Sequence, residues 1–93
     1  MVEMIMEDDE IKGKILDKMA RHRYWGGKHT DTLNLAKGFP KDIRKYVLKL
    51  VDEMKNDNLI ISKPTSYGEH VSLNIERKDE IQFLIDKFLV KKY

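Results

Sequence analysis

The spacing of apolar residues predicts two amphipathic helices before residue 57. Over residues 8–20 apolar side chains recur at i, i+4, i+5 and i+8, behind acids that favour a helix N-terminus. Over residues 40–56 they recur at i, i+4, i+7, i+8 and i+11, the strongest helical pattern in the chain. The positions are Ile11, Ile15, Leu16 and Met19 in the first helix and Ile43, Val47, Leu50, Val51 and Met54 in the second. Each helix therefore presents one apolar face to a core.

A shorter helix is predicted just before the second of these. Thr30 can cap a helix over residues 31–37, with Leu33 and Ala36 facing inward. Gly38 then ends it, and Pro40 suits the first position of the next helix because its missing N–H is not needed there. Residues 37–40 should form a tight turn between two helices.

Strand patterns follow residue 58. Residues 59–63 form a β-branched run that Pro64 terminates, and residues 70–74 alternate so that Val71 and Leu73 share one face. The turn-rich residues 64–69 lie between them, which predicts a hairpin with a six-residue loop. Residues 21–29, in contrast, have no period and contain a Gly-Gly pair, so they are expected to form a loop with a short extended piece.

The chain is expected to close with a helix over residues 75–92, capped by Asn74. Its apolar stripe is Ile81, Leu84, Ile85, Phe88 and Leu89. This stripe either closes the core or packs against a second copy in a homodimer. Residues 1–7 have the least determined pattern and are interpreted as a tail, which leaves residues 8–93 as a single domain.

This order of elements resembles the winged helix-turn-helix, an α+β fold. The residues that carry the resemblance are the short helix with Leu33-Asn-Leu-Ala-Lys37, the Gly38-Phe-Pro40 turn, a long helix, and a hairpin over residues 59–74. With its Trp25-Gly-Gly-Lys-His-Thr30 loop and its Gly-Phe-Pro turn, the chain is also similar to small uncharacterised archaeal proteins of this type. The resemblance implies DNA binding through the long helix and the hairpin, or wing.

Charge sharpens this expectation. The net charge is only +2, but residues 1–10 sum to −5, residues 11–45 to +7 and residues 46–93 to 0. The basic third covers the loop, the short helix and the start of the long helix, and a concentrated positive surface suits an anionic partner. On the long helix, Lys41, Lys45 and Lys49 lie opposite the apolar stripe, with Arg44 on its flank.

Other classes are excluded or disfavoured. The sequence has no cysteine, so a disulfide scaffold, a zinc finger or a thiol nucleophile is excluded. The absence of a long apolar run and of a basic leader predicts a cytoplasmic protein with no membrane partner. His22, His29, His70 and Glu69 have no metal-ligand spacing that predicts their meeting, and no serine has a nucleophile motif. We therefore expect no catalytic residue, no metal and no cofactor.

The leading interpretation is a non-enzymatic, double-stranded DNA-binding regulator or chromosome-associated factor. The predicted contact residues are Arg21, Arg23, Lys28, Lys41, Arg44, Lys45, Lys49, Lys63 and Tyr67. One alternative is an RNA- or ribosome-associated protein that stacks bases on its aromatic loop, although a lone tryptophan such as Trp25 more often covers a core. A second alternative is a protein-interaction module that binds no nucleic acid.

Overall fold

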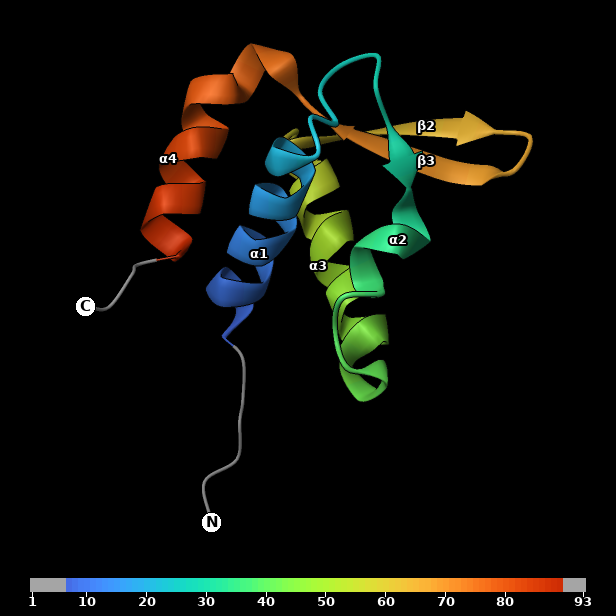
Figure 1. Ribbon diagram of the computed structural model, residues 1–93, viewed down its shortest axis with the longest axis horizontal. Helices are drawn as coiled ribbons and strands as arrows, with labels where there is room; N and C mark the ends of the chain where they lie inside the picture. The colour runs from blue at the N-terminus through green and yellow to red at the C-terminus, as the bar shows by residue number, and fades with distance from the viewer. Residues whose placement is uncertain (1–6, 90–93) are drawn as a thin grey trace.

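The computed structural model describes residues 7–89, and the predicted tail is left almost wholly outside this range, as is the end of the predicted last helix. Four α-helices and a three-stranded antiparallel sheet form an α+β fold (Figure 1). One apolar core lies where α1, α3, α4 and the inner face of the sheet meet. Within the described residues, no helix has the length and apolar character that crossing a lipid bilayer requires.

Helix α1 (Asp8–Arg21) confirms the first predicted helix. Acids occupy its first turn, and the buried residues are those that the pattern selected. Gly13 lies within it, where a methyl group would come within 2.7 Å of Phe88 Cβ. The glycine therefore permits the close approach of α1 to the C-terminal helix α4 (Lys78–Phe88).

Helix α2 (Thr32–Ala36) starts later than predicted, and its cap and inward residues differ. Asp31, not Thr30, caps it by accepting a hydrogen bond from the Leu33 amide at 2.9 Å. Thr30 is instead paired with Val71 in a short strand, β1 (Thr30–Asp31). The altered start turns Leu33 outward, to 59% exposure, and buries Leu35 in its place. The prediction of an inward Leu33 was therefore wrong, whereas that of Ala36 is confirmed.

Helix α3 (Arg44–Asn56) is preceded by a single 3₁₀ turn over Lys41–Ile43. Pro40 is extended (φ −55°, ψ 147°) and precedes this turn instead of opening the helix. The predicted apolar stripe is confirmed, with Val47, Leu50, Val51 and Met54 buried and Ile43 partly buried.

The predicted hairpin is present with longer strands and a shorter turn. Strands β2 (Ile60–Thr65) and β3 (Gly68–Leu73) leave only Ser66 and Tyr67 between them, so the predicted six-residue loop was wrong. Pro64 does not end β2, because β2 is an edge strand in the order β1-β3-β2 and one side of its backbone needs no partner. Gly68 takes φ +121°, a backbone conformation that disfavours other residues.

Asn74 accepts a hydrogen bond from the Glu76 amide at 3.1 Å, as expected of a cap, and a 3₁₀ turn over Ile75–Arg77 leads into α4. Ile81 and Ile85 are buried, and α4 lies alongside α1 (Figure 1). The predicted stripe thus closes the core. A homodimer through α4 stays a prediction, and it would have to use the outer face, where Phe83 is 62% exposed.

Replacing Gly13 by alanine tests the contact between α1 and α4. The added Cβ must displace Phe88 and Leu89, and overpacking of this kind costs about 1–3 kcal/mol, more than the roughly 1 kcal/mol that alanine gains in a helix. We expect Gly13→Ala to lower the free energy of unfolding in denaturant titration. Gly27→Ala is the matched control, because nothing lies within 4 Å of its added methyl. Equal stability of the two variants would contradict this packing.

Candidate functional site

Three lysines lie along the solvent side of the 3₁₀ turn and α3. Lys41, Lys45 and Lys49 are exposed, opposite the buried stripe, as the pattern predicts. Within residues 7–89 none of them forms an ion pair with a carboxylate, and Lys49 Nζ lies 5.8 Å from the centre of the Tyr46 ring. We call these residues the lysine row. Their charges are available to an anionic partner.

Arg44 stabilises the turn between α2 and α3. Its Nε donates to the Phe39 carbonyl at 2.9 Å and its Nη2 to the Lys37 carbonyl at 3.1 Å. These carbonyls follow the end of α2, where backbone acceptors lack helical partners. Arg44 therefore fixes the turn that presents the lysine row, and part of its donor capacity is already used.

An acid from the N-terminal stretch contacts the flank of α3. The Tyr46 hydroxyl donates to Asp8 Oδ1 at 2.5 Å, and this hydrogen bond is the main cause that raises the pKa of Tyr46. Tyr46 follows Lys45 in the sequence, and its ring lies close to Lys49 Nζ. Asp8 therefore brings a negative charge next to the lysine row. Among the described acids at the start of the chain, Asp8 therefore weakens the positive field of the lysine row.

A groove of about 360 Å³ lies between α3, the start of α2 and the hairpin tip. Leu48 and Asp52 line it from α3, Leu33 from α2, and Tyr67 from the tip, where its side chain is 90% exposed. Asp52 follows Lys45 and Lys49 on the exposed face of α3. The lysine row therefore leads towards a groove whose far wall is the hairpin.

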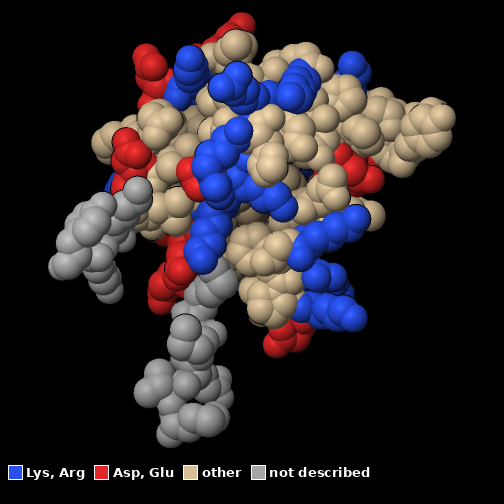
Figure 2. Space-filling view, viewed as in Figure 1, with Lys and Arg blue, Asp and Glu red and all other residues tan. Residues whose placement is uncertain are grey.

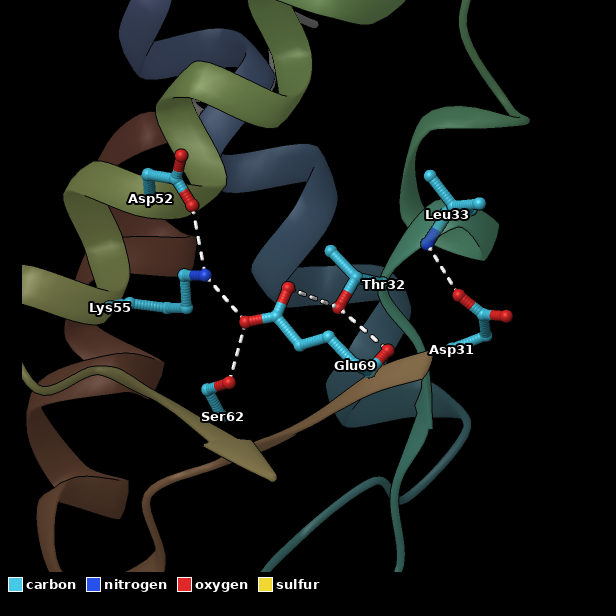
Figure 3. A network of polar contacts seen from close by, with 7 residues as sticks. All are labelled: Asp31, Thr32, Leu33, Asp52, Lys55, Ser62 and Glu69. Carbon is cyan, nitrogen blue, oxygen red and sulfur yellow. Dashed lines mark hydrogen bonds and ion pairs between the residues drawn. The ribbon is translucent and has the colours of Figure 1, made fainter. Parts of the chain in front are cut away.

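Glu69 organises a polar network at the base of this groove (Figure 3). Its Oε2 accepts from Lys55 Nζ at 2.6 Å and from Ser62 Oγ at 2.5 Å, and its Oε1 accepts from Thr32 Oγ1 at 3.0 Å. Lys55 also pairs with Asp52 at 2.9 Å. The network joins the last turns of α3, both strands of the hairpin and the start of α2.

The ionisation of the network follows from these contacts. The hydrogen bond from Lys55, followed by that from Ser62, holds the pKa of Glu69 below its ordinary value. The hydrogen bond to Glu69 likewise raises the pKa of Lys55, against an opposing effect of burial. Both groups are charged at neutral pH, so Lys55 offsets only part of the negative charge of Asp52 and Glu69. The groove floor therefore carries a net negative charge, unlike the lysine row.

Three further predicted contact residues, Arg23, Lys28 and Lys63, do not gather with the lysine row. Lys63 is the register partner of His70, and alternation along β3 places that pair on the opposite face of the sheet from Glu69. Arg23 and Lys28 are exposed on the loop after α1, which lies at the other end of the molecule from the α2–α3 turn (Figure 1). The expected single basic surface is therefore divided.

The aromatic loop is partly structural. Trp25 is partly buried against the core and forms a bridge to Leu73, which confirms that it covers the core. His22 stacks on Tyr24, with ring centres 5.7 Å apart.

The sequence did not predict that His29 and His70 meet, yet their Nδ1 atoms are 2.8 Å apart. Within residues 7–89, no three side chains of His, Asp or Glu form a cluster that could hold a metal ion.

A second basic region lies along α1, and the sequence predicted only Arg21 of it as a contact residue. A groove of about 550 Å³ separates α1 from the α2–α3 turn, and its basic side chains are Lys14, Lys18 and Arg21. Lys18 Nζ donates to the Asn34 carbonyl, and Arg21 pairs with Asp17 at 3.0 Å. Figure 2 shows Lys and Arg gathering over α1 and near that turn, whereas the outer hairpin is uncharged on this face.

Comparison with known proteins gives no relative: no family model, no curated protein and no solved structure matches this chain.

The Glu69 network predicts a pH-dependent contribution to stability. We expect Glu69→Gln to lower the free energy of unfolding at pH 7 by about 1 kcal/mol, a modest value because this side chain is 37% exposed and solvent screens the pair. Because the pKa of Glu69 is lowered on folding, its contribution is full above the ordinary glutamate value and fades as the pH falls through the lowered one.

Chemical denaturation of both proteins between pH 7 and pH 2 measures this difference. Glu76→Gln removes an equal charge from an exposed position and should show no such convergence at low pH. A difference between wild type and Glu69→Gln that stays constant with pH would contradict the role of the ion pair.

Proposed function

We propose that this chain is a winged-helix protein that binds double-stranded DNA without catalysing a reaction. The observation that carries the proposal is the lysine row, whose three ammonium groups have no carboxylate partner among the described residues. The row runs along α3 towards the groove beside the hairpin. Lysines four residues, or about one turn, apart repel one another on a free helix, and an anionic partner relieves that repulsion.

The arrangement of elements supports this choice. A short helix, a tight turn and a longer helix precede an antiparallel hairpin, with β1 as third strand, and this layout is compatible with the winged helix-turn-helix. In such a layout the first turns of α3 enter the major groove, where an α-helix fits. Lys41, Lys45 and Lys49 then contact phosphates and base edges, and Tyr67 at the hairpin tip contacts the adjoining backbone.

The acids around the groove limit the part of this surface that duplex DNA contacts. Asp52 and Glu69 repel phosphate at the groove floor, so the duplex contacts the start of α3 and the hairpin tip on either side of it. Lys63, Arg23 and Lys28 contribute only to the long-range field, because they do not share this side of the molecule. Against the RNA alternative, the ring of Trp25 is partly buried against the core and is not free for base stacking.

Replacement of one lysine of the row tests the proposal. In fluorescence anisotropy with a labelled duplex oligonucleotide, Lys45→Ala should weaken binding and lower the slope of log K against log salt by about one, the value for one lost phosphate contact. Lys78→Ala is the matched control, since it removes the same charge from an exposed position on α4. Asp8→Asn should act in the opposite direction and strengthen binding, because Asp8 lies beside the row.

Three outcomes would contradict the proposal. Absence of duplex binding at low salt would leave a protein-interaction module. Equal losses for Lys45→Ala and Lys78→Ala would place the contact elsewhere. Stronger binding to single-stranded RNA than to duplex, with no loss for Lys45→Ala, would favour the RNA alternative.

A further inference from the structure

His29 and His70 form a hydrogen-bonded pair of imidazoles that the proposed function does not use. They lie 41 residues apart, at the end of the loop after α1 and in the central strand β3. Their Nδ1 atoms are 2.8 Å apart, and the rings meet edge to face with centres 4.9 Å apart. Both side chains are partly buried. Two ring nitrogens at this distance bond only if one carries a proton and the other offers a lone pair.

The number of protons on the pair decides whether it holds together. With both rings neutral, one Nδ1–H donates to the other Nδ1. After one proton is added, an imidazolium still donates to a neutral imidazole, and the charge strengthens the bond. After a second proton, both Nδ1 atoms carry hydrogen, so the bond is replaced by two donors and two like charges in contact.

We propose that this pair is a pH-sensitive latch that fastens the loop after α1 to β3 and opens when it takes up its second proton. Histidine is the side chain that gains charge on mild acidification, so a fall in pH is the condition that opens the latch. Its action requires no ligand, and it therefore stands or falls independently of nucleic-acid binding.

The surroundings of the pair do not neutralise a doubly charged state. The register partners of His70 are Asp31 on β1 and Lys63 on β2, which bring one charge of each sign. Asp31 already accepts the hydrogen bond that caps α2, and Lys28 adds a positive charge next to His29 in the sequence. Glu69 and Lys55 lie on the other face of the sheet and pair with each other.

The latch closes a loop that few other bonds attach to the sheet. The Leu73 amide donates to the Tyr24 carbonyl at 2.7 Å, and the Gly26 amide donates to the Leu73 carbonyl at 3.2 Å. Beyond these, the partly buried Trp25 provides the apolar contact with the core. β1 follows His29 directly and stays paired with β3 through Thr30 and Asp31. Opening therefore frees only the stretch between the Leu73 bonds and β1, which should loosen protection at Leu73 and expose Trp25.

Two measurements on the wild-type chain follow the latch between pH 8 and pH 5.5. Trp25 is the only tryptophan, so its fluorescence emission reports loop docking, and a red shift on acidification is expected with unchanged far-UV circular dichroism. Hydrogen exchange of the Leu73 amide, corrected for the intrinsic effect of pH, should lose protection by about tenfold. Glu69 stays ionised in this range, because its pKa is lowered, and does not contribute to the change.

Variants separate the latch from other acid effects. His70→Asn keeps a polar atom at the position of Nδ1 but does not titrate, so the fluorescence shift and the loss of protection should both disappear. His22→Asn is the matched control, because His22 stacks on Tyr24 away from the pair, and it should retain both changes. His29→Asn provides a second test from the loop side in case His70→Asn does not fold.

Nitrogen-15 NMR of the wild-type histidines keeps the proposal testable without any variant. At pH 8 the Nδ1 atoms of His29 and His70 should differ, one protonated and one not, whereas His22 serves as the internal reference. Equivalent, rapidly exchanging Nδ1 signals would overturn the latch. Persistence of the acid-induced fluorescence shift in His70→Asn, or its absence from the wild type, would also overturn it.

Discussion

The alternation of side chains along β3 is the constraint on which the rest of the structure depends. β3 is the central strand, so its backbone is hydrogen-bonded to a neighbouring strand on each side, and its side chains point alternately to the two faces of the sheet. Val71 and Leu73 face the core, and Glu69, two residues before Val71, shares their face and needs cationic and hydroxyl donors where α3 and α2 approach. His70 takes the other face and meets the loop after α1. A shift of one residue in this strand would exchange both sets of partners.

Periodicity was sufficient to predict the helices, because burial of one face governs where an amphipathic helix packs. The stripes of α1 and α3 are buried as predicted. Predictions failed where single hydrogen bonds decide the local geometry. Thr30 and Asp31 are both good caps, and pairing of Thr30 with Val71 leaves the cap to Asp31, which rotates Leu33 out of the core. The hairpin turn was predicted to be too long because Pro64 ends a central strand but not an edge strand.

The candidate site was predictable only as far as it follows helix geometry. The exposure of Lys41, Lys45 and Lys49 follows from the apolar stripe opposite them. Arg44 could not be assigned to the α2–α3 turn from spacing, because its acceptors are backbone carbonyls that every residue carries. The sequence held one signal for the Glu69 network, a carboxylate that alternates with Val71 and Leu73 on one face of a predicted strand. It did not identify the partners of that carboxylate. The division of the basic residues depends on tertiary placement, which local charge sums do not contain.

The ion pair between Lys55 and Glu69 also has a mechanical consequence. It anchors the hairpin to the last turns of α3, while the turn at Ser66 and Tyr67 lies beyond any contact of the network. Glu69 is the second residue of β3, so the hairpin is held close to its tip and only the turn lies outside these contacts. A partner that engages Tyr67 orders only the tip, so the entropy lost on binding is confined to a few side chains, and force applied there reaches α3 without passing through the hydrophobic core.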